Sequence, residues 1–416
     1  MKIQNIYPLL QAALLLLFAS CTQEEFPAVQ DKAQQLTISV TDGGYTSAVE
    51  NMKTRAVEYG YATEFTEGDA CGLYVVRDGM VTAKNIKLTA TQANGKPAWT
   101  LPEGTTLNYD PADRYFLYYP YQETLEGTVA PTGADDAAFF ADVISKWQPK
   151  SDQSTYAAYT ASDLMTAIGQ VGNKDANGKR RLTFSMAHRM AMAVIEMPKT
   201  VYKFTNTEGI PDYIAATSAD FGENKPYSPV SGTYRYIVSP SAQTAPTLTG
   251  SYADGKKEFT ITPAGIIANS YKTYKVEGAV QKAHLLQIGD FFLADGRLLS
   301  KDAEASVVQA ANVVGIVFQT DKSRIGAAEK EKLGENNVHG LVMSVKKTGE
   351  NVQWSTESKD FDGLTNCETV AQGYSDISGL NNYNTVIAYA KGENKLSSYP
   401  AFEAVDNWNA DGSERK

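Results

Sequence analysis

"CGLYVVRDGMVTAKNIKL", residues 71–88, carries the clearest signal for the fold of this 416-residue chain. Val, Ile, Leu and Tyr recur on both sides of Asp78-Gly79, and these residue types are common in strands. An Asp-Gly pair accepts the positive φ angles that a tight hairpin turn requires. The stretch therefore predicts two antiparallel strands joined by a short turn.

A second strand signal lies upstream, where residues 36–40 read "LTISV". Leu36, Ile38 and Val40 alternate with polar residues, so the segment has one apolar face at a period of two residues. The polar, glycine-containing "TDGGY" follows at once. The pattern predicts a half-buried strand that ends at this turn.

Two longer stretches extend the β pattern. "RYFLYYPY", residues 114–121, is aromatic at almost every position, and Pro120 is expected to mark the strand's end or a free edge. "RLTFSMAHRMAMAVIEM", residues 181–197, contains two apolar runs and predicts a long bent pair of strands. A helix is the alternative for this stretch, because Met and Ala favour helices. With 24 Tyr in the chain, the sequence predicts a mostly β protein.

The N-terminus predicts export. Residues 9–19, "LLQAALLLLFA", are too few to span a bilayer but suit the core of a signal peptide. The following "LFASC" resembles the lipobox of bacterial lipoproteins, which predicts a signal peptide over residues 1–20 and lipidation of Cys21. An ordinary signal peptide cut near Cys21 is the alternative. Glu24 and Glu25 resemble the acidic tag of Bacteroidetes lipoproteins that are sent to the outer face of the outer membrane.

Composition limits the classes of partner and of stabilising device. The formal net charge is −10, and losing Lys2 with the signal peptide makes it −11, so attraction to nucleic acid is disfavoured. Once Cys21 carries lipid, Cys71 and Cys367 remain, far apart in the sequence. A disulfide framework is therefore not expected, and an apolar core must stabilise the fold. The length predicts two or three domains.

An ordered set of motifs resembles a known family. Along the chain come "TRA", "EFTEGDACGLYVV", Trp99 after a Gly-Lys-Pro turn, "YFLYYPY", "SDLMTA", "LTFSMAHRMA" and "FTITPAGIIANSYKTYKVEG". This order, over residues 36–275, resembles the fimbrillin-like pilins and pilin-related lipoproteins of Bacteroidales. The resemblance implies two successive transthyretin-like β-sandwich domains, here placed at residues 56–200 and 201–281. It also implies assembly into fimbriae at the cell surface.

The resemblance gives a meaning to "NMKTRAVEYG", residues 51–60. It implies that a surface protease cuts between Arg55 and Ala56, so that residues 21–55 form a lipidated pro-segment. The strand carrying Leu36, Ile38 and Val40 would then be a plug. Its release would leave a hydrophobic groove that another subunit fills by β-strand addition. The alternative is that Arg55-Ala56 belongs to a solvated linker.

The last third of the chain departs from the two-domain plan. "HLLQIGDFFLADGRLLS", "VVGIVFQTDKSRIG" and "VHGLVMSVKKTGENVQWS" each read as an apolar strand followed by a turn. Residues 284–416 are expected to form a smaller accessory domain of mixed α/β type. It resembles the lectin-like C-terminal domains of some Bacteroidales surface proteins and tip pilins. The resemblance implies that it meets a host or microbial surface ligand, with a glycan as one candidate.

Catalytic and cofactor motifs are not found in the sequence. It has no glycine-rich phosphate loop, nucleophile elbow, His-Glu-x-x-His or Cys-x-x-Cys. His188, His284 and His339 are expected to be structural, since His188 falls in a predicted core strand and His339 at a strand start. Asp290 and Asp295 flank "FFLADG" and are expected to be turn residues rather than a glycosidase pair. We expect no enzyme activity and no cofactor.

A possible calcium loop near the C-terminus is also set aside. "NWNADG" holds four residues spaced like the start of such a loop: Asn407, Asn409, Asp411 and Gly412. The twelfth position, which supplies the bidentate Glu, would fall beyond Lys416, so a simple turn is predicted.

The sequence thus predicts a fimbrillin-like lipoprotein pilin subunit, acting as a tip or accessory adhesin. Its expected location is the outer membrane, the cell surface and the fimbrium. Expected partners are other fimbrillin subunits, a surface ligand and, before cleavage, the membrane through the N-terminal lipid, but no nucleic acid. The alternative is a surface glycan-binding lipoprotein that does not polymerise.

Overall fold

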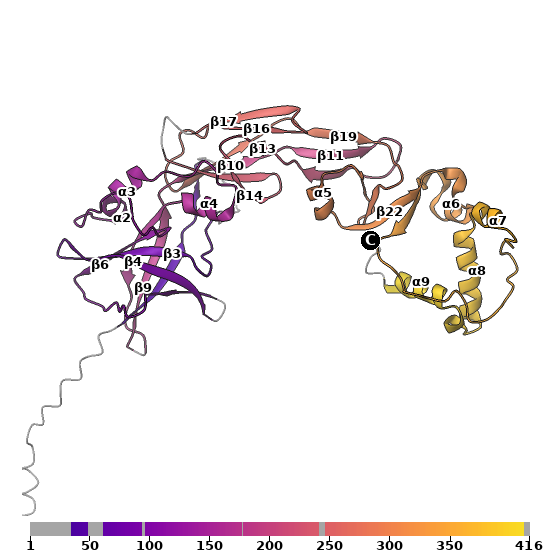
Figure 1. The fold of residues 1–416 in the computed structure, drawn as a ribbon, viewed down its shortest axis with the longest axis horizontal. Coiled ribbons are helices and arrows are strands. Elements are labelled where there is room, and N and C mark those ends of the chain that lie inside the picture. Colours follow the sequence, from indigo (N-terminus) through magenta and orange to yellow (C-terminus); the bar gives the residue numbers. More distant parts are fainter. Residues whose placement is uncertain (1–34, 49–60, 94–95, 177, 241–245, 412–416) are drawn as a thin grey trace, which may run out of the picture.

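The computed structural model describes residues 35–48, 61–93, 96–176, 178–240 and 246–411. Strands dominate as far as residue 344, and helices dominate after it. The parts follow one another along an elongated arch, with the first sheet at one end, further sheets in the middle and the helical region at the other end (Figure 1). The prediction of a mostly β protein is confirmed, and the C-terminal region adds helices to it.

The first sheet, called sheet one below, takes most of its strands from residues 70–188 and one from further upstream. Seven strands follow in the spatial order β1-β9-β7-β6-β3-β4-β5, and β8 also pairs with β9. β1 pairs with β9 in parallel, and the other pairs are antiparallel. The bounds are β1 Leu36–Asp42, β3 Ala70–Arg77, β4 Met80–Ala93, β5 Lys96–Thr100, β6 Asp113–Tyr119, β7 Met165–Ile168, β8 Gln170–Val171 and β9 Arg180–His188.

The predicted hairpin and the predicted strand end are both confirmed. β3 and β4 pair antiparallel, and the two residues between them, Asp78 and Gly79, both have positive φ, at 49° and 73°. This is the turn conformation that an Asp-Gly pair favours. β6 ends at Tyr119, directly before Pro120. It lies in the middle of the sheet, between β3 and β7, so Pro120 marks the strand's end and not a free edge.

Sheet one is buried on both faces of its central strands, which explains the aromatic run in β6. Tyr115, Leu117 and Tyr119 belong to one core, called the first core below, which the curled sheet encloses. Phe116 and Tyr118 belong to a second core on the opposite face. That face is covered by three short helices and their loops: α2 Asp136–Phe139, α3 Ala141–Lys146 and α4 Tyr156–Ser162.

The stretch over residues 181–197 consists of two strands that join different sheets. β9 pairs within sheet one, whereas β10 (Ala191–Glu196) lies between β15 and β18 of a second sheet. The strand interpretation is correct and the helix alternative is wrong. The change of sheet falls at Arg189 and Met190, about ten residues before the division predicted at Thr200. Because β10 is buried on both faces, its apolar residues run without alternation.

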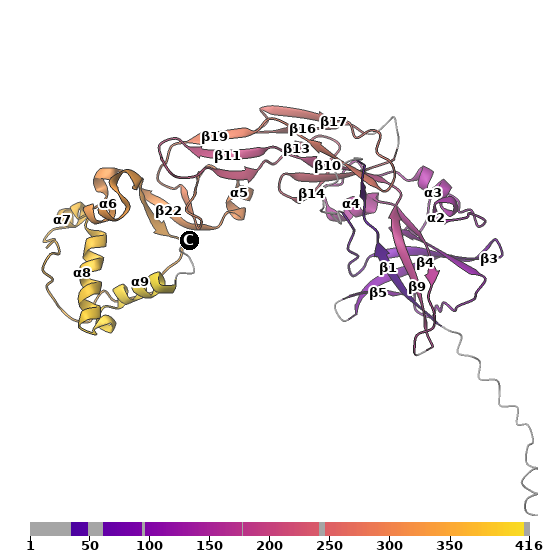
Figure 2. The same cartoon turned by 180° about the vertical axis from the view of Figure 1, so that it is seen from behind.

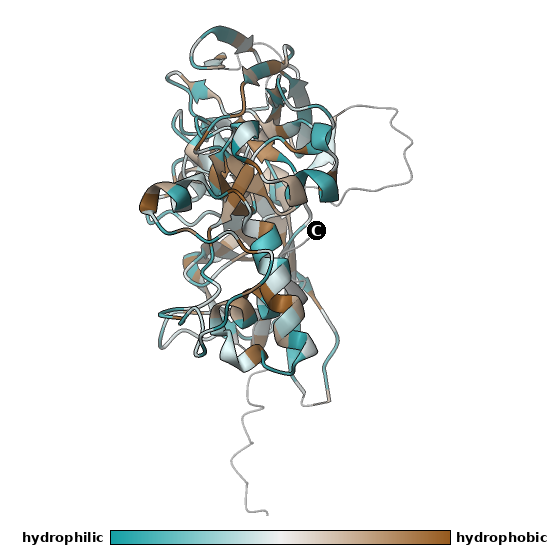
Figure 3. Cartoon of the chain, turned by 90° about the vertical axis from the view of Figure 1, so that its right-hand side faces the viewer, coloured by the Kyte–Doolittle hydropathy of each residue, from teal (hydrophilic) through white to brown (hydrophobic). Residues whose placement is uncertain are grey.

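The middle of the arch contains three sheets. Sheet two has the order β14-β15-β10-β18-β2, and two three-stranded sheets have the orders β12-β11-β19 and β13-β16-β17. A third core lies among them. In the molecule as a whole, hydrophobic residues gather toward the interior and hydrophilic residues toward the outer loops and helices (Figure 3). The bounds are β2 Thr46–Ser47, β11 Lys199–Phe204, β12 Tyr213–Ala216, β13 Asp220–Phe221, β14 Tyr227–Val230, β15 Thr233–Val238, β16 Leu248–Tyr252, β17 Lys257–Ile261, β18 Ser270–Lys275 and β19 Val280–His284.

The C-terminal region combines a small antiparallel sheet with helices. The sheet has the order β21-β20-β22-β23, and the helices after it have their own apolar core around Val386, Tyr399 and Phe402. Residues 407–411 are helical, so the turn predicted there is wrong. The bounds are β20 Phe291–Leu293, β21 Leu298–Leu299, α5 Ala305–Ala310, β22 Val313–Gln319, η1 Lys322–Arg324, α6 Ala327–Leu333, η2 Glu335–Asn337, β23 Leu341–Ser344, α7 Val370–Ser375, α8 Gly379–Gly392, η3 Leu396–Ser398 and α9 Pro400–Asp411.

Candidate functional site

β1 lies at the edge of sheet one, beside β9 and with β5 close by (Figure 2). It pairs with β9 in parallel along its whole length, starting with Leu36 opposite Arg180. On its other side, the backbone N–H of Leu36 donates to the carbonyl of Leu107 at 3.0 Å. β1 therefore fills a slot between β9 and the segment around Leu107.

The three residues of the predicted plug face the first core. Leu36 is 4% exposed and Val40 is 7% exposed, and the half-buried Ile38 packs against the same core. The alternation predicted from the sequence is therefore present in the structure. Burying an aliphatic side chain of this size stabilises a fold by roughly 1.5–3 kcal/mol. Removing β1 would expose apolar surface on its neighbours, among them Leu107, Leu182, Phe184 and Met186.

The same stretch of chain continues from sheet one to sheet two. After β1, residues 43–45 lead into β2, which pairs in parallel with β18 at the edge of sheet two. Thr46 N donates to Asn269 O at 3.0 Å, and Ala48 N donates to Tyr271 O at 2.9 Å. Residues 35–48, called the leading segment below, therefore cover an edge of both sheets.

A buried charge cluster lies where the leading segment passes between the two sheets. His188, the last residue of β9, has Nε2 3.0 Å from Asp42 Oδ1 and Nδ1 2.8 Å from Asp163 Oδ2. The ring of Tyr45 stacks on the imidazole with centroids 3.7 Å apart, and its hydroxyl donates to Asp163 Oδ1 at 2.7 Å. The side chains of Asp42, Asp163 and His188 are at most 4% exposed. These four residues are called the His188 cluster.

The carboxylate of Asp42 also binds backbone from both sides of the predicted cleavage site. It accepts hydrogen bonds from the N–H of Gly44, at 2.9 Å, and from the N–H of Thr63. Its contact with His188 Nε2 is short, but it lacks the alignment of a hydrogen bond and is best described as an ion pair. Asp42 thus joins the leading segment to chain on the far side of Arg55.

The surroundings of His188 favour its charged form. Burial alone lowers the pKa of His188, but the charge and hydrogen bond of Asp163, together with the close carboxylate of Asp42, outweigh burial and raise the pKa to about 9. Burial likewise opposes ionisation of Asp42, yet His188 and the two backbone donors hold the pKa of Asp42 below its usual value. Burial raises the pKa of Tyr45 well above its usual value, and Asp163 adds to that effect. At neutral pH His188 is therefore an imidazolium, and Asp42 beside it is a carboxylate.

Sequence reasoning placed His188 in a core strand but did not find the cluster. Asp42 stood in "TDGGY", where an Asp beside glycines indicates a turn. Asp163 falls within the motif "SDLMTA" and Thr63 directly precedes "EFTEGDACGLYVV", but neither motif points to a contact with His188. The partners of His188 are far apart in the sequence, so local pattern carried no signal for their meeting.

The other two histidines also have structural partners. His284 Nε2 is 2.9 Å from Asp290 Oδ1, and its Nδ1 is 3.3 Å from Ser300 Oγ. This resembles a Ser-His-Asp set, but Ser300 is 5% exposed and Asp290 is fully buried, so a substrate could not reach the hydroxyl. His339 Nε2 lies 3.0 Å from the carbonyl of Glu208.

Both aspartates that flank β20 have the turn role expected of them. Asp290 Oδ2 accepts from the backbone N–H of Gln287, and Asp295 Oδ1 accepts from the backbone N–H of Arg297. Neither therefore has the free carboxylate that an acid–base pair would need.

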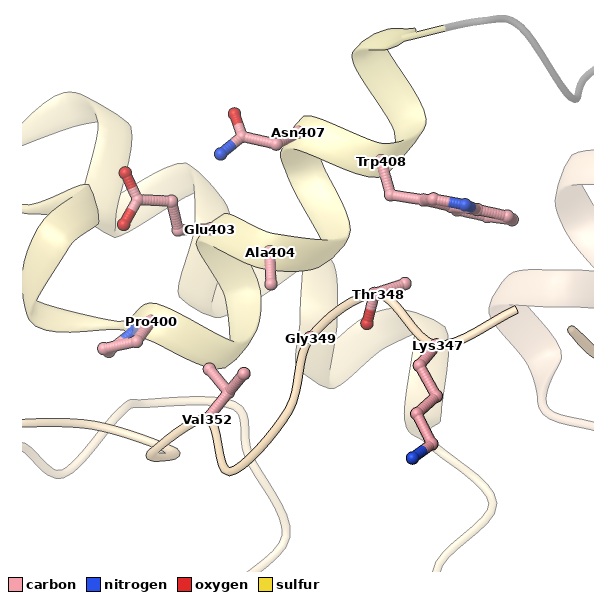
Figure 4. Close-up of a pocket in the computed structure, with 9 residues that line it drawn as sticks. All are labelled: Lys347, Thr348, Gly349, Val352, Pro400, Glu403, Ala404, Asn407 and Trp408. Atoms are coloured by element: carbon pink, nitrogen blue, oxygen red, sulfur yellow. The ribbon is translucent and has the colours of Figure 1, made fainter. Parts of the chain in front are cut away.

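An open cleft of about 530 Å³ lies in the C-terminal region, between α9 and the loop around Thr348 (Figure 4). Trp408 extends away from Glu403 and Asn407, so these side chains do not converge on a common point (Figure 4). The calcium-loop spacing is not realised, because residues 407–411 continue α9. Within the described residues, no group of three or more His, Cys, Asp or Glu could hold a metal ion.

Several predicted sites lie outside the described residues. These are the signal peptide over residues 1–20, the lipidation site Cys21 and the cleavage pair Arg55 and Ala56. Among the helices that the structure does describe, none is long and apolar enough to cross a membrane.

Comparison with known proteins identifies the family. The fimbrillin-like family model matches residues 54–290. A protein of Bacteroides ovatus named "Putative fimbrium tip subunit Fim1C" is 32% identical over 383 residues, which cover 82% of this chain and 67% of that protein. The crystal structure of a fimbrial protein from Bacteroides ovatus is 25% identical, with a TM-score of 0.51, and the match covers 92% of this chain and 82% of that one.

These matches are to fimbrial proteins and not to enzymes, in agreement with the expectation of a non-enzymatic protein. They do not identify the C-terminal region as lectin-like. Together with the β-rich architecture and its edge strand β1, they show that the chain belongs to the fimbrillin-like family.

Proposed function

We propose that this fimbrial subunit is cut after Arg55 and that a strand of a neighbouring subunit then replaces its leading segment. The observation that carries the proposal is the position of β1, an edge strand whose apolar face fills a slot in the first core. Such a strand can be exchanged without breaking the pairing between the other strands of its sheet. The proposal also places the protein at the cell surface, with Cys21 lipidated before cleavage.

Release of the leading segment would open two edges at once. β9 and β18 would each lose a parallel partner, leaving unpaired N–H and C=O groups beside exposed apolar side chains. An extended strand with alternating apolar residues can pair with these backbone groups and cover the apolar side chains, which is the principle of β-strand addition. Thirteen residues from Leu36 to Ala48 span roughly 40 Å when extended, so the incoming strand would be long.

We further propose a position at the fibre tip. The curated relative is named as a tip subunit, and the match to it covers most of this chain. From β20 to α9, the strands are paired with one another, and α8 and α9 pack on a core of their own, whereas α5 shares a core with β11 and β12. This region is therefore suited to present a surface to a host or microbial ligand, which the tip of a fibre would meet first.

Arg55→Ala is expected to block assembly. The uncut chain would keep its leading segment in place and could not accept a donor strand, so its share in sheared surface fibres should fall at least tenfold. The measurement is immunoblotting of purified fibres, together with N-terminal sequencing of the wild-type protein, which should begin at Ala56. Lys53→Ala is the matched control, since it removes a basic residue two positions away and leaves Arg55 intact.

Equal incorporation of the Arg55→Ala protein would refute the proteolytic mechanism. If the wild-type protein is also uncut, stays on the cells and never enters fibres, the result would instead favour the alternative of a tethered glycan-binding lipoprotein.

An antibody to residues 284–416 is expected to label only the ends of fibres. The reason is that a terminal subunit occurs once per fibre, whereas a shaft subunit repeats along its length. Immunogold electron microscopy of wild-type cells measures the distribution, and a strain that lacks the protein gives the background. Label along the whole shaft would rule out the tip position.

A further inference from the structure

The His188 cluster suggests how the vacated edge would select its incoming strand. We propose that His188 Nε2 and the backbone N–H of Thr63 form a site that binds a carboxylate, called the carboxylate site below. This proposal rests on the strand exchange described above. This site would select a strand that carries an acidic side chain at the position of Asp42.

Both groups of this carboxylate site belong to chain that remains after a cut at Arg55. Thr63 N–H and His188 Nε2 now converge on the two oxygens of one carboxylate, that of Asp42. Asp42 itself lies upstream of the cut and would leave with the leading segment. Cleavage and release would therefore empty a site whose imidazolium and backbone N–H are already in place.

A strand without an acidic side chain at this position would leave His188 Nε2 and the N–H of Thr63 without the carboxylate that they bind in the intact chain. His188 is fully buried, and Asp163 alone would then face its charge. An unpaired donor in a buried site costs about 1–3 kcal/mol, and more when the group is charged. An incoming Asp or Glu would avoid this cost and restore the arrangement of the intact chain.

The site would also fix the register of the incoming strand. The apolar part of the slot accepts any strand with the right alternation, so it discriminates weakly between partners. Pairing between one buried charge and one acid is specific to a single position, and a slip of one residue would turn the acid to the opposite face. Asp42 is the last residue of β1, so the carboxylate site lies where the leading segment passes from sheet one to sheet two.

Labelled peptides can test this selection in the full chain. A site-specific protease sequence placed within residues 49–60 allows cutting whether or not Arg55 is a natural site. After cutting, peptides copying residues 35–48 are added in excess, either unaltered or with Asp42→Asn, Asp42→Glu or Val40→Asp. Fluorescence anisotropy at pH 7 then gives the Kd of each peptide.

We expect the unaltered peptide to bind, Asp42→Asn to bind at least about tenfold more weakly, and Asp42→Glu to recover part of the loss. The ionisable side chains in contact with His188 are Asp42, Tyr45 and Asp163. At pH 10 the imidazole loses its proton, so the difference in Kd between the unaltered and the Asp42→Asn peptides should narrow. Val40→Asp should bind weakly at both pH values, because it places a charge in the first core.

The outcomes separate the two proposals. Equal binding of the unaltered and Asp42→Asn peptides would overturn the carboxylate site and leave strand exchange standing. Failure of every peptide to bind, with the cut segment retained, would overturn both. Weaker binding of Asp42→Asn that does not change with pH would also overturn the role of His188.

Discussion

His188→Ala is expected to lower the free energy of unfolding by about 3–5 kcal/mol at pH 7, because it leaves buried charges without their partner. Asp42 and Asp163 would face each other across the vacated space, each at most 4% exposed. Tyr45 would lose the ring on which it stacks. Urea unfolding followed by tryptophan fluorescence measures the difference from the wild type.

The loss of stability caused by His188→Ala should depend on pH. The folded pKa of His188 is raised to about 9, above an unfolded value near 6.5. The stability that its charge contributes is therefore fully present below pH 6.5 and is lost as the pH rises through 9. It amounts to about 3 kcal/mol, from the size of the pKa shift. The difference between wild type and variant should accordingly shrink between pH 7 and pH 10.

His339→Ala is the matched control, since that side chain makes one hydrogen bond, to the carbonyl of Glu208. Its loss should cost about 1 kcal/mol and should not follow the same pH profile. Equal costs for the two variants would show that the cluster does not stabilise the fold.

Local patterns predicted the elements of the first sheet well. The Asp78-Gly79 turn, the alternation of Leu36, Ile38 and Val40, and the strand end at Pro120 all depend on neighbours in the sequence. Physical preferences for turns and strands act over a few residues, so such features can be predicted from the sequence alone.

Pairing between distant segments could not be predicted in the same way. The parallel register of β1 on β9 joins Leu36 to Arg180, and nothing near either residue specifies the other. The continuous apolar run of β10 indicated burial but not which sheet would receive it. The His188 cluster arises from these same long-range pairings, which is why it was missed.

The C-terminal helices did leave signals in the sequence. Thr369 and Gln372 form a capping box at the start of α7, a spacing that predicts a helix N-terminus. In α8, Val386, Ile387 and Ala390 are buried at helical spacing. The three motifs quoted from residues 284–355 indicated strands, so they did not locate the helices of the expected mixed α/β region.

Val40→Asp is expected to release β1 from sheet one while the rest of the first core stays folded. Val40 is 7% exposed and belongs to a core that includes Phe184, so a carboxylate there would be buried without a partner. That cost is several kcal/mol, and local detachment of an edge strand avoids it. Hydrogen exchange should therefore speed up at least tenfold in β9, while β6, at the centre of the sheet, keeps its protection.

Thr41→Asp gives the comparison that isolates burial from charge, since Thr41 is the next residue on the same strand and is exposed. It should leave the exchange of β9 close to that of the wild type. If Val40→Asp instead removes the protection of β6 and β9 together, β1 is part of the cooperative core. In that case β1 could not act as a plug. Its release after cleavage at Arg55 would unfold the domain that has to accept a strand of the neighbouring subunit.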